Sequence, residues 1–149
     1  MKRIMVAVDG SEHAHRAVDM AADLAFRYEI PLSVVHVAAQ PTMGHVPADL
    51  AIYQKLESVY VSQADAFDEA ARHIVERAAE RARQAGAPKV ETIVDSGDPA
   101  ATIVRLAKEV GADLIVMGSR GLGSVAGLLL GSVSHKVGHA APCAVLTVR

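Results

Sequence analysis

The sequence has only one cysteine, Cys143, no tryptophan, and few other aromatic residues: two phenylalanines and three tyrosines in 149 positions. A single cysteine excludes an internal disulfide. Because Cys143 lies in a segment that we expect to be a strand, we predict a buried structural thiol. The scarcity of aromatic side chains also removes the usual platform on which single-stranded nucleic acids stack.

An excess of positive charge is also missing. The chain carries 15 Lys and Arg against 17 Asp and Glu, which gives a net charge of −2 at pH 7 and a pI near 6.4. Proteins that bind nucleic acids neutralise phosphates with clustered Lys and Arg. Here the basic residues are dispersed among acidic ones, so we exclude nucleic acid as a partner.

The sequence contains no long hydrophobic run at its beginning. Met1-Lys2-Arg3 is followed by an apolar run that ends at Asp9-Gly10. An exported chain begins with an apolar segment of roughly 7 to 15 residues, and a membrane-spanning helix needs about 20. We therefore expect a cytoplasmic protein that does not enter a membrane.

What the sequence does contain is a regular alternation of short, β-branched apolar runs with longer helical patterns. This alternation is typical of parallel βαβ architecture, and the length fits one domain spanning residues 1–149. Continuously apolar strands belong in the centre of such a sheet, whereas polar residues indicate an edge. We predict five strands, of which the first and fourth are central and the third is an edge strand: Ile4–Val8, Leu32–Val37, Val90–Val94, Leu114–Met117 and Ala144–Val148.

Helices are expected between these strands, each with recognisable start or stop signals. Ser11 is a suitable N-cap for the first helix, and Asp98 followed by Pro99 is suitable for the third. A long second helix runs roughly from Asp49 to Ala85, and a fourth follows Gly131-Ser132.

This order of elements predicts a single-domain α/β fold: a doubly wound, Rossmann-like sheet of five parallel strands in the order 3-2-1-4-5, with helices on both faces. Ligands of such folds bind at the carboxyl ends of the strands, where the strand order reverses. That point lies between the first and fourth strands. The least regular stretch, Ala38–Pro47, is a candidate lid next to it.

Three glycines and a serine near the carboxyl end form a spaced motif. Gly118 is followed by two residues and Gly121, then by nine residues and Gly131-Ser132. Glycines let a backbone approach a phosphate closely, and the start of the helix after Gly131 would supply free amides and a positive dipole. The alternative is that the glycines only form turns and allow close helix packing.

Two better-known nucleotide motifs are excluded. Gly121-Leu122-Gly123 with Ala126 matches a dinucleotide fingerprint in spacing, but it does not follow the first strand, and no acidic residue occurs after Asp113 to hold a ribose. A phosphate loop of the Walker type needs Gly-Lys-Ser/Thr, which is absent. The motif is therefore of another kind.

The motif Gly118-x2-Gly121-x9-Gly131-Ser132 resembles the ATP-binding signature of the universal stress protein family. The resemblance spans the whole chain, since it includes the opening Ile4-Met5-Val6-Ala7-Val8-Asp9-Gly10-Ser11, the strand end Val35-His36-Val37, the turn Asp95-Ser96-Gly97-Asp98-Pro99 and the closing Pro142-Cys143-Ala144-Val145-Leu146-Thr147-Val148. The fold implied is the adenine nucleotide alpha hydrolase-like sheet, although the Ser-Gly-Gly-x-Asp loop of its pyrophosphatase relatives is not found at residues 9–14.

The resemblance implies ATP as ligand, with Mg²⁺ or Mn²⁺ held mainly by the phosphates, in a cytoplasmic homodimer joined through the last strand, Ala144–Val148. Asp9 would lie on the nucleoside side, Val37 would offer backbone atoms to adenine, and Met117 would pack near the base. Arg120 either reaches phosphate oxygens or remains solvated. The residues implied around ribose and phosphates are Gly118, Gly121, Gly131, Ser132, Val133 and Ser134.

The predicted function is a nucleotide-responsive dimeric sensor in the stress response. Two alternatives remain open: a slow ATPase or phosphotransferase that uses the same pocket, and a nucleotide-free interaction dimer. Hydrolysis needs a positioned base or water-orienting group, and no residue has a diagnostic spacing for one, so we assign no catalytic residue. His135 and His139 lie one helical turn apart but lack a third ligand, so we assign no metal site.

Overall fold

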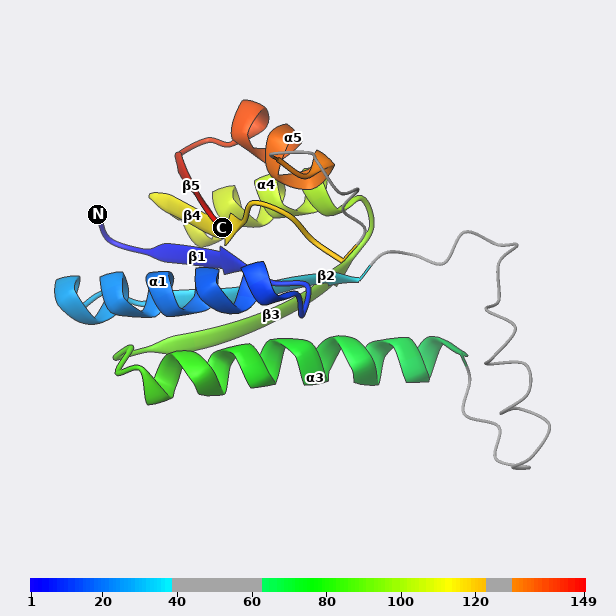
Figure 1. Ribbon diagram of the computed structural model, residues 1–149, viewed down its shortest axis with the longest axis horizontal. Helices are drawn as coiled ribbons and strands as arrows, with labels where there is room; N and C mark the ends of the chain where they lie inside the picture. The colour runs from blue at the N-terminus through cyan, green and yellow to red at the C-terminus, as the bar shows by residue number, and fades with distance from the viewer. Residues whose placement is uncertain (39–62, 123–129) are drawn as a thin grey trace.

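The computed structural model describes residues 1–38, 63–122 and 130–149 as a five-stranded, entirely parallel sheet flanked by helices (Figure 1). The strand order is β3-β2-β1-β4-β5, which confirms the predicted topology. The elements are β1 (Ile4–Ala7), α1 (Glu12–Tyr28), β2 (Leu32–Ala38), α3 (Gln63–Gln84), β3 (Val90–Ser96), α4 (Pro99–Val110), β4 (Leu114–Gly118), α5 (Ser132–Ala140) and β5 (Ala144–Val148).

The strands begin where the sequence predicts, and all except β5 differ by one or two residues at their ends. β1 ends at Ala7 rather than Val8, and β3 continues through two polar residues to Ser96 because it pairs with β2 as far as Ala38 opposite Ser96. Ladder hydrogen bonds thus extend a strand beyond its apolar run. Of the predicted long second helix, 49–62 lies outside the described residues, as does nearly all of the candidate lid.

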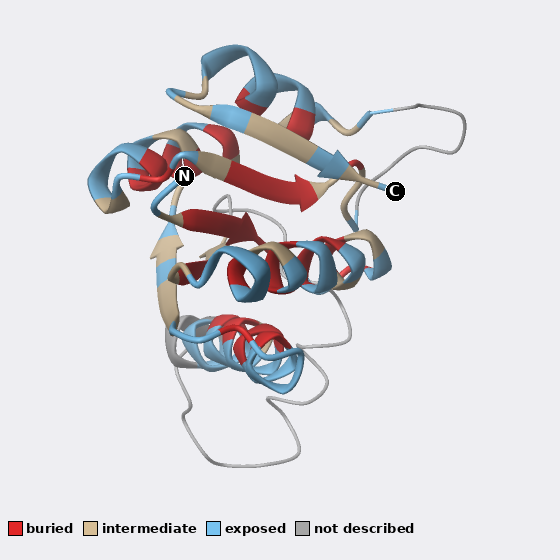
Figure 2. Cartoon of the chain, turned by 90° about the vertical axis from the view of Figure 1, so that its left-hand side faces the viewer, coloured by how far each residue is buried: buried red, intermediate tan, exposed pale blue. Residues whose placement is uncertain are grey.

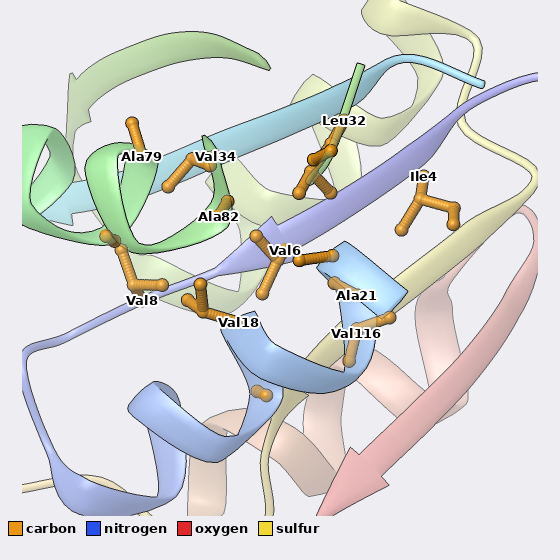
Figure 3. Packing of buried hydrophobic residues seen from close by; sticks show 14 of the residues in the cluster. Ile4, Val6, Val8, Val18, Ala21, Leu32, Val34, Ala79, Ala82 and Val116 are labelled. Atoms are coloured by element: carbon orange, nitrogen blue, oxygen red, sulfur yellow. The ribbon is translucent and has the colours of Figure 1, made fainter. Parts of the chain in front are cut away.

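The sheet separates two hydrophobic clusters. One lies beneath α1 and α3 and contains Val6, Val18 and Ala79, which are labelled in Figure 3. The other lies beneath α4 and α5 and contains Ile103 and Val137. Figure 2 shows the same division, because the helices turn their buried side toward the sheet and their exposed side away. Helices therefore cover both faces, as the central strands β1 and β4 require.

The helix caps position the loops at the carboxyl end of the sheet. The Ser11 hydroxyl accepts the Ala14 amide at 3.2 Å, and the Asp98 carboxylate accepts the Ala101 amide at 2.9 Å. Both confirm the predicted N-caps. Gly131 caps α5 without any side-chain hydrogen bond, so in the described part of the chain this helix lacks the side-chain cap that α1 and α4 have.

Charged residues fasten the amino end of the chain and join α1 to α3. Asp113 accepts the amides of Lys2 and Arg3, and these bonds lower the pKa of its carboxyl. The Asp19 carboxylate on α1 binds Arg81 on α3, and the Arg81 hydrogen bond lowers the pKa of Asp19. These contacts join elements that are far apart in sequence.

The thiol of Cys143 is only partly buried, so the predicted fully buried thiol is wrong. Cys143 directly precedes the edge strand β5, whose outer side has no further strand to cover it. Desolvation nevertheless raises the pKa of the thiol. No helix in the described ranges has the length and apolarity needed to cross a membrane.

Candidate functional site

A cavity of about 110 Å³ lies where the loops after β1 and β4 face each other, at the point where the strand order reverses. Its apolar side is formed by strand residues and by Ile103 of α4. Its polar side is formed by the two loops and the start of α5. The lining residues are Ala7, Val8, Asp9, Ala14, Val35, Val37, Ile103, Met117, Gly118, Arg120, Gly121, Val133 and Ser134.

The structure brings the predicted site residues together. Eight of the ten line this one cavity; they come from the loop after β1, from β2, β4, the loop after β4 and the start of α5. The remaining two, Gly131 and Ser132, are the N-cap and first residue of α5, directly before Val133. Their grouping is a property of the fold, while their role in binding a ligand remains a prediction.

The three glycines of the motif have different surroundings. A Cβ at Gly118 would lie 2.9 Å from the Cβ of His13, so Gly118 allows the start of α1 to pack against the end of β4. A Cβ at Gly121 would meet the Asp9 carboxylate well inside 3.0 Å. At Gly131 the nearest atom would be 3.4 Å away, an ordinary contact. Close packing therefore explains Gly118 and Gly121 even without a ligand, whereas it does not explain Gly131.

Asp9 joins the two loops. Its carboxylate accepts the Ser11 amide at 3.0 Å within its own loop and the Leu122 amide at 3.2 Å from the opposite loop. Each carboxylate oxygen has a second acceptor position. Asp9 can therefore hold the loops together and still accept a ligand hydroxyl.

Arg120 presents a charge that no described residue neutralises. Its Nε atom is buried and has no hydrogen-bond partner, and its guanidinium forms no salt bridge in the described part of the chain. A buried donor of a charged group without a partner is costly. The Nε atom of Arg120 is therefore not solvated, and an anion in the cavity would give it a hydrogen-bond partner.

The first turn of α5 supplies further donors. In the described ranges, none of the amides of Ser132, Val133 and Ser134 donates to another group. The Ser134 hydroxyl differs from our expectation, because it donates to the carbonyl oxygens of Ser119 and Gly131, each at 3.0 Å. Ser134 therefore offers its amide to the cavity, while its hydroxyl fixes the loop.

Two residues that the sequence analysis did not select are part of this arrangement. Ser119 is 1% exposed and forms hydrogen bonds through its amide, carbonyl and hydroxyl groups. Its hydroxyl lies 3.3 Å from Nδ1 of His13. Only the position of His13, two residues after the cap Ser11 and hence beside the first loop, could have indicated this contact.

A larger hollow of about 760 Å³ lies on the other face of the sheet, between α1 and α3. It shares Val8 and Asp9 with the smaller cavity, and Ile74, His73 and Arg77 of α3 form its far side. Asp9 is the only predicted site residue among those that line it. Size favours this hollow, and its Arg77 can also bind an anion, but the glycines of the motif and the first turn of α5 line the smaller cavity.

The described residues do not form a metal site. No group of three His, Cys, Asp or Glu side chains in these parts of the chain could hold a metal ion. His135 and His139 lie edge to face, with ring centroids 4.7 Å apart, on the exposed side of α5.

Comparison with known proteins connects this site to a family. The model of the Universal stress protein family matches residues 1–149. The chain is 36% identical over 147 residues to Universal stress protein YxiE of Bacillus subtilis, covering 99% of this chain and 98% of the relative.

Two solved structures with the same fold were obtained with nucleotides. A universal stress protein in complex with cAMP has a TM-score of 0.68 at 31% identity, covering 99% of this chain and 96% of its own. The universal stress protein from Archaeoglobus fulgidus in complex with dAMP has a TM-score of 0.70 at 26% identity, covering 100% and 98%. The match over the full chain, together with the glycine motif and the strand order, shows that the chain belongs to the universal stress protein family.

Proposed function

We propose that this protein binds ATP in the cavity between the loops after β1 and β4, and that it acts in the cytoplasm as a nucleotide-responsive regulatory protein. The observation that carries the proposal is the buried Nε of Arg120, which lacks a hydrogen-bond partner among the described residues and lies in a cavity with one apolar side. A pocket with an apolar side and a cation that is unpaired in the described part of the chain suits a ligand that has a flat apolar part and an anionic part.

The cavity has a matching place for each part of the nucleotide. Val37 and Met117 form an apolar wall suited to adenine, and Val37 lies at the open end of β2, where its backbone groups are near the crevice. Arg120 and the free amides at the start of α5 suit the phosphates. Mg²⁺ or Mn²⁺ would be bound mainly through phosphate oxygens and water.

The volume indicates that only part of the ligand occupies this cavity. Binding pockets for whole small molecules measure about 300–1,000 Å³, against about 110 Å³ here. We propose that the phosphates extend out of this cavity, toward the first turn of α5. This direction places the negative charge at the positive end of the helix dipole.

The comparisons support an adenine nucleotide, because two neighbouring structures of the family were solved with cAMP and dAMP. The choice of ATP is our proposal and depends on the glycine motif together with the free amides of α5. We further propose that the protein works as a homodimer through β5, the last strand and the edge of the sheet.

Calorimetric titration of the purified protein with ATP tests the proposal, with Arg120→Gln as the key variant. Hydrogen bonds to charged groups contribute about 1.5–3 kcal/mol, so we expect the affinity for ATP to fall about 10- to 100-fold. Arg27→Gln is the matched control, since Arg27 is an exposed arginine that pairs with Asp23 on α1. This control should bind ATP like the unmodified protein.

Equal ATP affinity of Arg120→Gln and the unmodified protein would remove the basis of the proposal. Absence of any heat with the unmodified protein would favour the nucleotide-free interaction dimer instead. A single-turnover measurement on bound ATP distinguishes binding from slow hydrolysis, and we expect the ATP to be recovered unchanged.

A further inference from the structure

The turn Ser119–Leu122 carries Arg120 and Gly121 and is fastened at both of its ends. At one end, the Ser119 hydroxyl lies 3.3 Å from Nδ1 of His13. At the other end, the Leu122 amide donates to the Asp9 carboxylate at 3.2 Å. Both partners belong to the opposite wall of the cavity, which consists of the loop after β1 and the first turn of α1. The orientation of Arg120 therefore depends on two contacts made by other residues.

The contact to His13 is held in place by packing. Ser119 is 1% exposed, and His13 lies so close to Gly118 that even a Cβ at Gly118 would be 2.9 Å from the His13 Cβ. The Ser119 hydroxyl has no other partner in the described part of the chain, so it satisfies its hydrogen bonding through His13. It can donate to Nδ1 or accept from Nδ1–H, because a hydroxyl rotates to suit either tautomer.

Ser119 also extends the effect of this contact to α5. Its carbonyl oxygen accepts the Gly131 amide at 2.7 Å and the Ser134 hydroxyl at 3.0 Å. These bonds join the turn after β4 to the start of α5 and fix the direction of the first turn of this helix. A shift of Ser119 would thus move both donors to the phosphates, the Arg120 guanidinium and the free amides of the helix.

We propose that His13 is a positioning residue of the nucleotide site: through Ser119 it holds Arg120 and the start of α5 toward the phosphates without touching the ligand. This inference rests on the proposed function. According to this inference, a histidine on α1, outside the glycine motif, helps to orient the groups that donate hydrogen bonds to the phosphates.

The test is a double-mutant cycle on ATP affinity with His13→Leu, Ser119→Ala and the double variant. Ser119→Ala removes only the hydroxyl and leaves the backbone bonds of Ser119 intact. Loss of one hydrogen bond should weaken ATP binding about 3- to 10-fold in each single variant. The double variant should be no weaker than either single one, because both remove the same contact.

Rescue separates positioning from simple structural damage. His13→Asn places an amide near the position of Nδ1 and should restore most of the affinity that His13→Leu loses. Arg16→Gln, an exposed change on the same helix, should leave the affinity unchanged. As a readout without nucleotide, the amides of Arg120–Leu122 should exchange hydrogen faster in His13→Leu than in His13→Asn.

The outcomes distinguish the two proposals. If the unmodified protein does not bind ATP, the proposed function fails, while the exchange rates still show whether His13 holds the turn. If the unmodified protein binds ATP and His13→Leu binds it equally well, with unchanged exchange at Arg120–Leu122, His13 has no positioning role. If the losses of ATP affinity in the two single variants add up in the double variant, the contact between His13 and Ser119 is not their common cause.

Discussion

At the scale of single residues, Gly121 allows the two loops to meet. Its Cα faces the Asp9 carboxylate so closely that an added Cβ would force one of them to move. We predict that Gly121→Ala breaks the hydrogen bond from the Leu122 amide to Asp9 and weakens ATP binding at least about tenfold. The loop is at the surface of the sheet end, so the chain should remain folded. Calorimetric titration with ATP measures the first effect and thermal unfolding the second.

Gly138→Ala is the control for this change. Gly138 lies in α5 and has free space where a Cβ would be, so alanine should stabilise the helix by up to about 1 kcal/mol without affecting ATP affinity. Undiminished binding by Gly121→Ala would show that the contact between Asp9 and the opposite loop is not required by the ligand.

The residues of the candidate site could be predicted only in part from the sequence. Gly118 and Gly121 are visible in the motif because the need for a missing side chain leaves a glycine at a fixed spacing. His13 leaves no such mark, since its role depends on how closely α1 packs on Gly118, a contact between positions more than 100 residues apart. Ser134 is among the residues implied around the ribose and phosphates, yet its hydroxyl donates to backbone carbonyl oxygens.

At the scale of elements, the order of strands and helices was predictable because the central strands are short apolar runs and because α1 and α4 begin at recognisable caps. Ser11 and Asp98 illustrate this, as each accepts the amide three residues further on. Strand ends were less predictable. The polar residues Asp95 and Ser96 continue β3 because backbone pairing with β2, rather than side-chain polarity, decides where the ladder stops.

The missing side-chain cap of α5 gives a prediction that separates stability from binding. Gly131 has φ −74° and ψ 158°, which any residue adopts, and a Cβ there meets only ordinary contacts. Gly131→Ser should therefore fit and cap the helix, raising the free energy of unfolding by a few tenths of a kcal/mol. The serine hydroxyl would accept a hydrogen bond from an amide that we expect to bind phosphate, so ATP affinity should fall by roughly 3- to 10-fold.

Gly131→Ala completes this comparison. Alanine is a poorer N-cap than glycine, so this variant should be less stable than the unmodified protein, yet it leaves the amides free and should retain ATP affinity. Unfolding by denaturant and titration with ATP should thus rank the two variants in opposite orders. The same order in both measurements would mean that the first turn of α5 does not bind the phosphates.

At the scale of the whole molecule, the sheet has two edges of different character. β3 is partly covered by α3 on one face, and Arg3 and Lys89 pair with Glu91 on it. β5 pairs only with β4 among the described strands, and Figure 2 shows it as a mixed strand of exposed and partly buried residues. Alternate backbone groups of such an edge remain available to another strand. Sequence alone could not distinguish these edges, because both strands contain apolar and polar residues.

The proposed homodimer through β5 predicts the effect of a charge on this edge. In a two-fold symmetric pair each change occurs twice and the new groups approach each other, and lysine on an edge strand opposes pairing. Thr147, which is exposed on β5, is the position to change. Thr147→Lys should raise the dissociation constant of the dimer on the order of tenfold. Sedimentation measures this constant from the proportions of 15.6 kDa monomer and dimer.

Thr92→Lys on β3 is the control and should leave the dissociation constant unchanged, since the opposite edge of the sheet takes no part in the proposed interface. If both variants dissociate equally, or if the unmodified protein is a monomer, β5 is not the interface. If Thr147→Lys is a monomer and still binds ATP, each chain contains a complete site.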